Sequence, residues 1–410
     1  MSAPSSILIV GAGHCGGRTV QALRAQGFAG RIDLVGDEPG LPYERPALSK
    51  GVLTGSRTPE SLDLLSEAQL QELGVQRHLA QVLALDAAAR TAQLSNGQTL
   101  PYGALLLAHG GAVRRLSIPG AELDAVYTLR NKADANRLAA ALQPGRRIVV
   151  VGGGFIGLEV AASARTRGCS VDLVEGGSQL MGRAVPALLA QRALQLHRAQ
   201  GVRIQLGVVP QAIAPQAQGV AVQLSNGQTL LADAVVVGIG IVPHTALAQA
   251  AGVQVARGIL VDRCLRTNVA QIYAAGDVAE FPSPLSGAWT RQETWQNAED
   301  QARVAAHNLC GENVEFRASA WFWSDQYDHQ LQVCGEPAAG TQLSTRAYDD
   351  GDVLLFSSDD AGRLVGACGW GLASRIAREL KLARMLVERG ATVDPALLAD
   401  PAIKLKALLR

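Results

Sequence analysis

The stretch Ile7-Leu8-Ile9-Val10-Gly11-Ala12-Gly13-His14-Cys15-Gly16 decides the fold, because its pattern returns later in the chain. The second copy reads Ile148-Val149-Val150-Val151-Gly152-Gly153-Gly154-Phe155-Ile156-Gly157. In each copy an apolar run typical of a buried strand leads into Gly-x-Gly-x-x-Gly and then into a segment of helical character. One such motif is weak evidence, since glycine-rich turns are common. Two copies in the same context indicate two similar α/β modules.

The glycines of these two stretches, here called the first turn (Gly11–Gly16) and the second turn (Gly152–Gly157), have separate physical tasks. The first glycine of each permits the tight turn from strand to helix, the second lets the backbone approach a pyrophosphate, and the third lets the helix pack on the strand. Free N–H groups at the start of the helix favour phosphate. Each turn therefore predicts a dinucleotide site, and two such sites are typical of electron transfer between them.

An acid after the next strand is expected to hold a ribose hydroxyl, about 20 residues beyond the first glycine. In the second module the strand Ser170–Val174 leads into Glu175, and in the first module Asp37 and Glu38 follow the strand Ile32–Val35. Asp37 is the stronger candidate because it lies nearest the strand end. Glu175 favours NADH over NADPH, because a carboxylate accepts from a free 2′-hydroxyl and repels a 2′-phosphate.

A later landmark also recurs in both modules. Leu94–Leu100 and Leu224–Leu230 are both Leu-Ser-Asn-Gly-Gln-Thr-Leu, and each leads into another apolar strand. Asn-Gly at the centre predicts a β-hairpin with a two-residue turn. The same hairpin at the same point of both modules suggests a structural duplication.

Composition excludes several classes of protein. The 410 residues are 48% hydrophobic with a net charge of +1, which gives no signal for nucleic acid, and no apolar run has the length of a membrane span. Met1–Ser6 lacks the features of a secretory signal, so a cytoplasmic location is expected. The six cysteines are scattered without Cys-x-x-Cys spacing, which argues against a metal site or a redox-active disulfide.

Two further segments complete the chain. The strand-like Ile272–Val278 ends in Gly276-Asp277 and precedes a helix predicted over Gln292–Leu309, an arrangement that directs a carboxylate toward a polyol chain. From about Ser319 the sequence alternates strand-like runs and closes on an amphipathic helix, Ser374–Arg389. This last part is predicted to be a small α+β domain.

At this point the motifs resemble a known family. Leu41-Pro42-Tyr43-Glu44-Arg45-Pro46-Ala47-Leu48-Ser49-Lys50 and Trp321-Phe322-Trp323-Ser324-Asp325-Gln326, with both turns and Tyr273–Val278, are similar to FAD-dependent ferredoxin reductases of bacterial oxygenase systems. These enzymes belong to the glutathione-reductase-like superfamily. The resemblance implies two Rossmann-like domains and a C-terminal α+β domain: a discontinuous FAD domain (1–111 and 241–318), an NADH domain (112–240) and an interface domain (319–410).

The resemblance also assigns residues by position. The residues implied for FAD are Gly11, Gly13, Cys15, Gly16, Asp37, Lys50, Val82, Arg130, Asp277 and Trp295. Those implied for NADH are Gly152, Gly154, Ile156, Gly157, Glu159, Glu175, Gly240 and Glu293. Lys50 and Glu159 carry the catalytic roles, because a cation stabilises reduced flavin and similar proteins pair this acid with the lysine. His109 departs from the family, whose members usually carry threonine there.

The implied activity is that of a ferredoxin–NAD(+) reductase, which takes hydride from NADH onto FAD and gives single electrons to a [2Fe–2S] ferredoxin for an oxygenase of aromatic catabolism. No cysteine lies between Gly16 and Gly152, where disulfide reductases of the superfamily carry their reactive thiols. The alternatives are a rubredoxin reductase or diaphorase, and a non-catalytic flavoprotein similar to apoptosis-inducing factor. For ferredoxin docking the sequence offers Arg375, Arg378, Lys381 and Arg384, which equally suit a solvated helix face.

Overall fold

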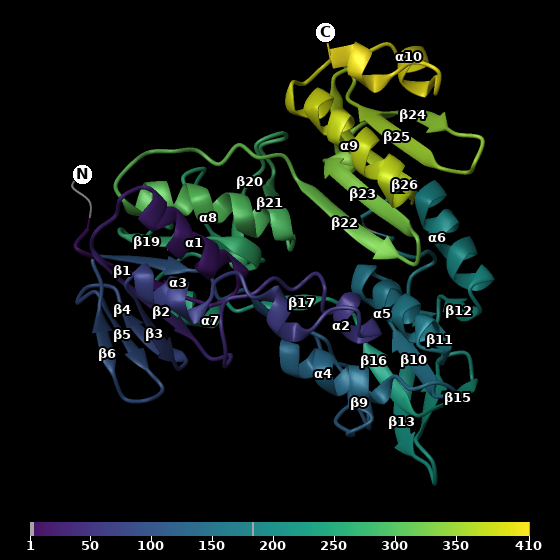
Figure 1. Cartoon of the computed structure of the whole chain (residues 1–410), viewed down its shortest axis with the longest axis horizontal. Coiled ribbons are helices and arrows are strands. Elements are labelled where there is room, and N and C mark those ends of the chain that lie inside the picture. Colours follow the sequence, from purple (N-terminus) through teal and green to yellow (C-terminus); the bar gives the residue numbers. More distant parts are fainter. Residues whose placement is uncertain (1–3, 183, 410) are drawn as a thin grey trace. The chain divides into compact units, whose positions relative to one another are not determined.

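The computed structural model describes residues 4–182 and 184–409 (Figure 1). The chain divides into two compact units, which are described separately. The first unit comprises Met1–Arg45, Leu62–Ala112 and Val242–Ala320, and the second comprises Pro46–Ser61, Val113–Ile241 and Trp321–Arg410. The predicted three-domain division stays a prediction; the segment with Ser49 and Lys50 groups with the second unit.

The first unit is built on a five-stranded sheet in the order β19-β7-β1-β2-β3, whose strands are all parallel. Their bounds are β1 Ser6–Val10, β2 Arg31–Gly36, β3 Val75–Leu79, β7 Ala104–Leu107 and β19 Ile272–Ala274. Helix α1 (His14–Ala25) follows β1 and packs against α8 (Trp295–Leu309). The helix that the sequence predicted over Gln292–Leu309 begins three residues later, at Trp295, because the Thr294 side chain caps its N-terminus.

The second unit repeats this plan with the parallel sheet β12-β11-β10-β16-β9. Its strands are β9 Val126–Tyr127, β10 Arg147–Val151, β11 Ser170–Glu175, β12 Val202–Leu206 and β16 Ala234–Val237. Helix α5 (Phe155–Thr166) follows β10 as α1 follows β1, and α6 (Ala187–Ala199) precedes β12. The central strands of both sheets are buried on both faces, which explains their continuous apolar sequence.

Each parallel sheet is accompanied by a three-stranded antiparallel sheet. In the first unit it consists of β4 (Val82–Asp86), β5 (Thr91–Leu94) and β6 (Thr99–Pro101). In the second it consists of β13 (Pro210–Pro215), β14 (Val220–Leu224) and β15 (Thr229–Ala232). The recurrence supports the predicted duplication.

The repeated hairpin has a longer turn than the sequence predicted. Leu94 N–H donates to Gln98 O (2.8 Å) and Gly97 N–H to Leu94 O (3.0 Å), and the second copy repeats both bonds. Gly97 and Gly227 have φ of 87° and 81°, but neither asparagine is left-handed. A two-residue type I′ turn needs two consecutive left-handed residues. The two-residue prediction was wrong; the turn has three residues and ends on a left-handed glycine.

The C-terminal part of the second unit is an antiparallel sheet in the order β22-β23-β26-β25-β24. Its elements are β22 Trp321–Gln326, β23 His329–Gly335, β24 Gln342–Ala347, β25 Val353–Ser358, β26 Leu364–Leu372, α9 Ala373–Glu388 and α10 Pro395–Ala399. Helix α9 packs on β23 and β26 and buries Ile376, Leu380 and Leu386. The α+β prediction and the two-module α/β prediction are both confirmed.

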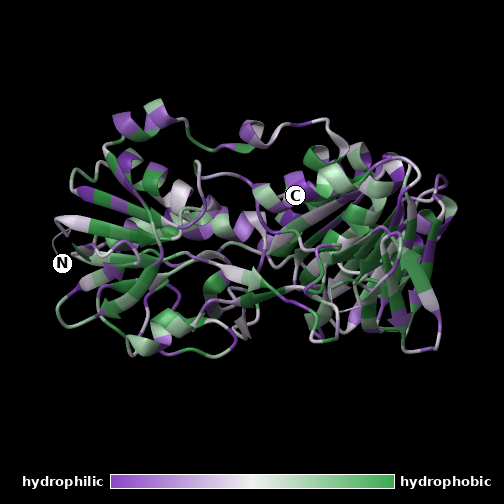
Figure 2. Ribbon diagram, turned by 90° about the horizontal axis from the view of Figure 1, so that it is seen from below, coloured by the Kyte–Doolittle hydropathy of each residue, from purple (hydrophilic) through white to green (hydrophobic). Residues whose placement is uncertain are grey.

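Shorter elements connect these sheets. They are α2 Gly51–Thr54, α3 Glu67–Glu72, β8 Gly111–Val113, α4 Lys132–Ala141, β17 Ile241–Pro243, α7 Ala246–Ala250, β18 Ile259–Leu260, β20 Ala279–Pro282 and β21 Trp289–Thr290. Figure 2 shows the hydrophobic residues concentrated along the strands of the sheets. Burying each large aliphatic side chain there contributes about 1.5–3 kcal/mol.

Candidate functional site

The two turns have nearly identical backbones. Gly11 and Gly152 have φ of 115° and 107°, in the region that favours glycine. A Cβ on Gly16 would lie 1.9 Å from Gly11 O, and a Cβ on Gly157 would lie 2.0 Å from Gly152 O. Both positions need glycine because the helix crosses its own entry strand there. The turn-forming and packing tasks predicted for these glycines are thus visible in the structure.

The middle glycines face open space. A Cβ on Gly154 would meet nothing within 4 Å, and one on Gly13 would meet only the Arg45 side chain, at 3.7 Å. Gly13 and Gly154 are the N-caps of α1 and α5, neither helix receives a side-chain cap, and neither has an acid in its first turn. An uncapped helix N-terminus beside open space fits a pyrophosphate. The residues present therefore fit a dinucleotide at each turn.

Glu175 lies directly on the second turn. Its carboxylate accepts from the backbone N–H of Gly153 and of Gly177, both at 2.6 Å. The equivalent position of the first module is Gly36, since Gly11 N–H donates to Val35 O as Gly152 N–H donates to Val174 O. A Cβ on Gly36 would lie 2.6 Å from the Ala12 Cβ. An acid at this position is excluded in the first module by the alanine of the turn.

The two acids that follow Gly36 have different surroundings. Asp37 is exposed and accepts from Gln81 Nε2 at 3.0 Å. Glu38 accepts from the Tyr43 hydroxyl at 2.6 Å and forms an ion pair with Arg45. Glu38 is thereby turned toward the side chains of Tyr43 and Arg45, whereas the exposed carboxylate of Asp37 has more capacity left for a ribose hydroxyl. The preference for Asp37 stays a prediction.

Other residues predicted for the first turn gather near the start of α1. Asp277 lies in a 3₁₀ turn (Gly276–Val278) whose Gly276 N–H donates to Gln301 on α8. Trp295 meets the ring of His14 edge-on, with centroids 5.3 Å apart. Cys15 is buried, and burial raises the pKa of its thiol. This cysteine is therefore a packed thiol.

Lys50 and Glu159 are brought together in the second unit. The Lys50 ammonium lies 3.4 Å from Glu159 Oε1 and donates to Asp325 Oδ2 at 2.7 Å. Glu159 is only 4% exposed and accepts from the hydroxyls of Ser49 (2.5 Å) and Ser324 (2.7 Å). One ammonium is thus shared by two carboxylates, of which Asp325 makes the shorter contact.

The two carboxylates differ in their electrostatics. Burial raises the pKa of Glu159, and the nearby Lys50 charge opposes this rise without cancelling it. At Asp325 burial also acts upward, but the charge of Lys50 and hydrogen bonds from Lys50 and Gln330 hold the pKa below its usual range. Asp325 therefore keeps its charge against Lys50, and Glu159 is the carboxylate closer to taking up a proton.

The remaining predicted residues lie apart from these clusters or at their edges. Val82 begins β4, Arg130 precedes α4 and donates its backbone N–H to Asp134, and Gly240 has a φ of 98°. Ile156 is an exposed apolar residue in the first turn of α5, and Glu293 forms an ion pair with Arg291. Their contacts with a dinucleotide stay predictions.

His109, the departure from the family, is held by the backbone of its own unit. Its Nε2 lies 2.8 Å from His244 O, and the two imidazoles stack with centroids 6.3 Å apart. Burial lowers the pKa of His109 to about 4, so the ring is neutral at physiological pH. The next residue, Gly110, has a φ of 62°, in the left-handed region that favours glycine.

Three of the four basic residues proposed for docking form ion pairs with neighbouring acids. Arg375 pairs with Asp350 and Asp352, Arg378 with Glu379, and Arg384 with Glu388. Of these cations only Arg378 has a largely exposed side chain, at 70%, whereas Arg375 and Arg384 are 29% and 25% exposed. Docking and a solvated helix face therefore both stay predictions for these residues.

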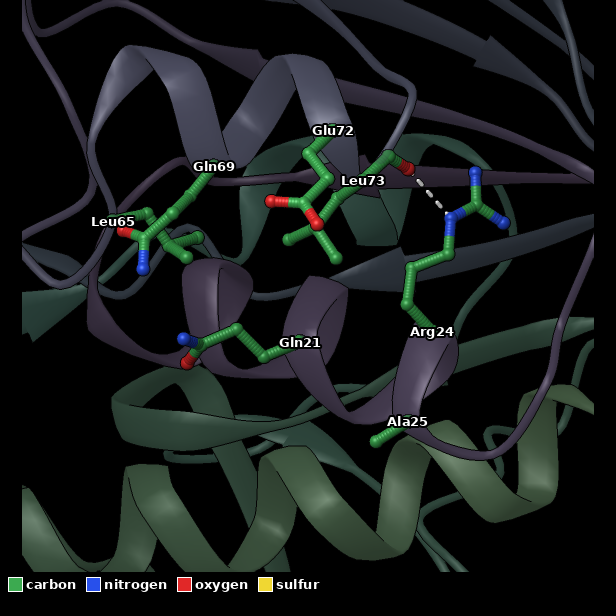
Figure 3. Close-up of a pocket in the computed structure, with 7 residues that line it drawn as sticks. All are labelled: Gln21, Arg24, Ala25, Leu65, Gln69, Glu72 and Leu73. Atoms are coloured by element: carbon green, nitrogen blue, oxygen red, sulfur yellow. Dashed lines mark hydrogen bonds between the residues drawn. The ribbon is translucent and has the colours of Figure 1, made fainter.

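One pocket lies away from all predicted site residues. It has a volume of about 420 Å³ and is lined by Gln21, Arg24, Ala25, Leu65, Gln69, Glu72 and Leu73 (Figure 3). Arg24 donates from Nε to Leu73 O at 2.6 Å. Arg24 and Ala25 end α1, whereas the first turn precedes its other end. The pocket is therefore separate from the predicted dinucleotide site.

Several residues of these clusters were not predicted. Ser49, Ser324 and Asp325 surround the Lys50–Glu159 pair, and all three stand in the two motifs that carry the resemblance. Arg45 places a cation beside Gly13, where its charge would attract a phosphate. The sequence feature that could have identified Arg45 is its place in the Leu41–Lys50 motif. Only the folded structure shows which atoms these side chains meet.

Within residues 4–182 and 184–409, no three His, Cys, Asp or Glu side chains converge as metal ligands. The six cysteines are free thiols, and five of them are buried. The described helices are all too short or too polar to span a bilayer.

Known proteins are similar to this chain over nearly its whole length. Residues 5–302 match the pyridine nucleotide-disulphide oxidoreductase family, and residues 321–409 match the reductase C-terminal family. The anthranilate 1,2-dioxygenase system ferredoxin–NAD(+) reductase component of Burkholderia cepacia is 41% identical over 407 residues, 98% of each chain. The p-cumate 2,3-dioxygenase system, ferredoxin–NAD(+) reductase component of Pseudomonas putida is 38% identical over 98% of each chain.

Solved structures agree with these matches. The ferredoxin reductase for the CYP199A2 system from Rhodopseudomonas palustris superposes with a TM-score of 0.94 at 36% identity, covering 99% of this chain and 100% of that one. Putidaredoxin reductase, in its covalent complex with putidaredoxin, also gives a TM-score of 0.94, at 33% identity over 99% of this chain and 98% of that one.

Proposed function

The chain belongs to the pyridine nucleotide-disulphide oxidoreductase family, and from this premise we propose that it is a ferredoxin–NAD(+) reductase. It would oxidise one NADH and reduce two molecules of a [2Fe–2S] ferredoxin, releasing NAD⁺ and one proton. The ferredoxin would supply an oxygenase. Because NADH is an intracellular coenzyme, this reaction belongs in the cytoplasm.

The observation that carries the proposal is the full-length similarity to reductase components of dioxygenase systems, at 41% and 38% identity. It spans both glycine turns and the C-terminal sheet, so it is not a likeness of nucleotide-binding modules alone. The missing thiols support the same activity. No cysteine lies between Gly16 and Gly152, so the chain lacks the thiols of a disulfide reductase there.

Each turn suits a different dinucleotide in this proposal. The first turn, with Arg45 beside Gly13 and Asp277 near the start of α1, suits a resident FAD. The second turn, with Glu175 on its backbone, suits a transient NADH. Bound FAD would supply the conversion from two-electron to one-electron chemistry.

The residues of the chain would bind and orient the two dinucleotides and would compensate the negative charge of the reduced flavin. The N–H groups at the starts of α1 and α5 would hold the two pyrophosphates, and Asp37 and Glu175 the riboses. Lys50 and Glu159 keep their predicted catalytic roles, the first as a cation that stabilises reduced flavin and the second as the acid that holds this cation. Asp325 fixes Lys50 from the other side.

The test is reduction of ferredoxins by the purified, flavin-loaded chain. With NADH and a panel of [2Fe–2S] ferredoxins, two equivalents of ferredoxin should be reduced per NADH, and NADPH should be a much poorer donor. Glutathione disulfide serves as the control acceptor and should not be reduced. Rapid disulfide reduction, or a long-lived reduced flavin that no ferredoxin reoxidises, would contradict the proposal.

A further inference from the structure

A chain of buried polar side chains leads from Glu159 into the C-terminal sheet and on to α6. Ser324 Oγ lies 2.7 Å from Glu159 Oε1, and Gln326 Nε2 lies 3.3 Å from Ser324 Oγ. Gln326 Oε1 lies 3.0 Å from His197 Nε2, and the Tyr327 hydroxyl lies 3.5 Å from His197 Nδ1. Ser324, Gln326 and His197 are all fully buried. These contacts have no place in the reaction described above.

The chemistry of the groups fixes the direction of every bond in the chain. An ionised Glu159 only accepts, so Ser324 donates to it and in turn accepts from the Gln326 amide. The remaining Gln326 oxygen only accepts, so His197 carries its proton on Nε2. The donors from His197 to Ser324 therefore all point toward the carboxylate.

His197 is suited to this position because it stays neutral. Burial lowers its pKa to about 4, and its Nδ1 is left as the acceptor facing Tyr327. Burial also raises the pKa of Tyr327, which keeps its hydroxyl proton in place. Neither group changes charge at physiological pH, so the chain presents a constant set of donors.

Opposing influences decide the charge of Glu159. The charged groups that face it are Lys50, ahead of α2, which lowers its pKa, and Asp325, on β22, which raises it. The hydroxyls of Ser49 and Ser324 both lower it, and burial raises it most. A buried carboxylate that accepts several hydrogen bonds keeps its charge more easily. The orientation of Ser324 therefore affects this balance directly.

The geometry points to His197 as a positioning residue for Glu159, acting through Gln326 and Ser324 to hold the Glu159 carboxylate in its ionised form. The catalytic meaning of this role rests on the proposed function, in which Glu159 holds Lys50. The chain of contacts stands independently of the electron acceptor.

The experiment is a pH titration of Glu159 in the full, flavin-loaded chain. Glutamate labelled with ¹³C at the side-chain carboxyl reports the titration by NMR, and Glu159→Gln assigns the signal. Ser324→Ala should raise the midpoint by roughly one pH unit and His197→Leu by roughly half a unit, because each removes or misdirects a donor. His197→Gln, which restores an N–H donor, should return the midpoint toward that of the wild type.

A double-mutant comparison separates positioning from a general structural effect. In the Ser324→Ala background His197→Leu should cause no further shift, because the chain is already broken. In the Ser49→Ala background it should cause its full shift, because Ser49 donates to Glu159 from outside the chain. Equal shifts in both backgrounds, or no shift of the single variant, would overturn the inference. If His197→Leu does not fold, Gln326→Met interrupts the same chain and is used in its place.

A second measurement connects the titration to the reaction. The pH profile of flavin reduction by NADH, followed in a stopped-flow instrument, should move with the Glu159 midpoint in the His197→Leu variant. An unmoved profile would overturn the positioning role. Neither measurement uses ferredoxin. If ferredoxin is not reduced while both shifts occur, the proposed function fails and this inference stands.

Discussion

Gly36 and Glu175 occupy the same position in the two modules, each directly after the strand residue whose carbonyl accepts the N–H of the first glycine of the turn. Ala12 stands beside Gly36, and Gly153 stands beside Glu175. The first module thus has alanine in the turn and glycine after the strand, whereas the second has glycine in the turn and an acid after the strand. Glu175 reaches the second turn because Gly153 leaves room for it, and the first module must take its acid from a later position.

Removing the charge of Glu175 should weaken NADH binding. In Glu175→Gln the KM for NADH should rise roughly tenfold, equivalent to about 1.4 kcal/mol, because a ribose hydroxyl loses a charged acceptor. Steady-state kinetics with a ferredoxin or an artificial acceptor measure this change. Asp349→Asn, at an exposed position of the C-terminal part, is the surface control. A Glu175→Gln enzyme with an unchanged KM would contradict the role of Glu175.

Substitutions of the middle and last glycines of the second turn should affect different properties, the first NADH binding and the second stability. Gly157→Ala should cost roughly 1–3 kcal/mol of stability, because its Cβ would lie 2.0 Å from Gly152 O. Gly154→Ala has open space and a φ of −79°, so it should fold normally and raise the KM for NADH roughly tenfold by obstructing the pyrophosphate. Thermal denaturation and kinetics together test this. Similar melting temperatures for the two variants would speak against the packing role of Gly157.

The two acids after Gly36 can be compared directly. Asp37→Asn should weaken FAD binding roughly tenfold, because its exposed carboxylate is available to a ribose. Glu38→Gln should have a smaller effect, because Glu38 is already engaged by Tyr43 and Arg45. Release of FAD, followed by the rise of free flavin fluorescence on dilution, measures both. The opposite order of effects would transfer the ribose role to Glu38.

The stability contributed by Glu299 should depend on pH. Burial acts to raise the pKa of Glu299, but the hydrogen bond from His14 and the charge of Arg18 hold it below its usual value. A carboxyl whose folded pKa is lowered stabilises the fold above its unfolded pKa, near 4.3, and this contribution is lost as the pH falls through the folded pKa.

Glu299→Gln should therefore lower stability by about 1 kcal/mol at pH 7, a figure discounted for solvent screening of a partly exposed pair. The difference from the wild type should shrink below about pH 4. Denaturant titrations at pH 7, 5 and 3.5 measure it. Glu312→Gln, at an exposed pair with His307, is the matched control. A difference that stays constant across this range would contradict the ionic role of Glu299.

The sequence predicted the parts of the site that are local. Both turns follow from spacing, because a strand, a tight turn and a helix leave few residue choices at Gly11, Gly16, Gly152 and Gly157. Glu175 followed from its distance along the chain. The hairpin turn was predicted one residue too short, because Asn-Gly also suits a three-residue turn in which only the glycine is left-handed.

Contacts between residues far apart in the sequence could not be predicted from local patterns. Lys50 and Glu159 are separated by more than a hundred residues, and their pairing came from the family resemblance and not from either residue alone. Nothing in the sequence indicated that Asp325 would make the shorter contact with Lys50, or that His197 would connect to Glu159. Such contacts depend on how β22 packs against α5 and how α6 packs against the C-terminal sheet, which no local pattern encodes.

The sequence by itself determined two dinucleotide-type modules and a C-terminal α+β domain, because hydrophobic periodicity and glycine spacing act over short stretches of chain. The tertiary structure alone decided the electrostatics around Glu159. Burial, one shared ammonium and a directed set of hydroxyl and amide donors meet there, supplied to α5 by Ser49 and Lys50 and by β22. The charge of a buried carboxylate depends on the balance of desolvation and donors in space, and that balance exists only once the chain has folded.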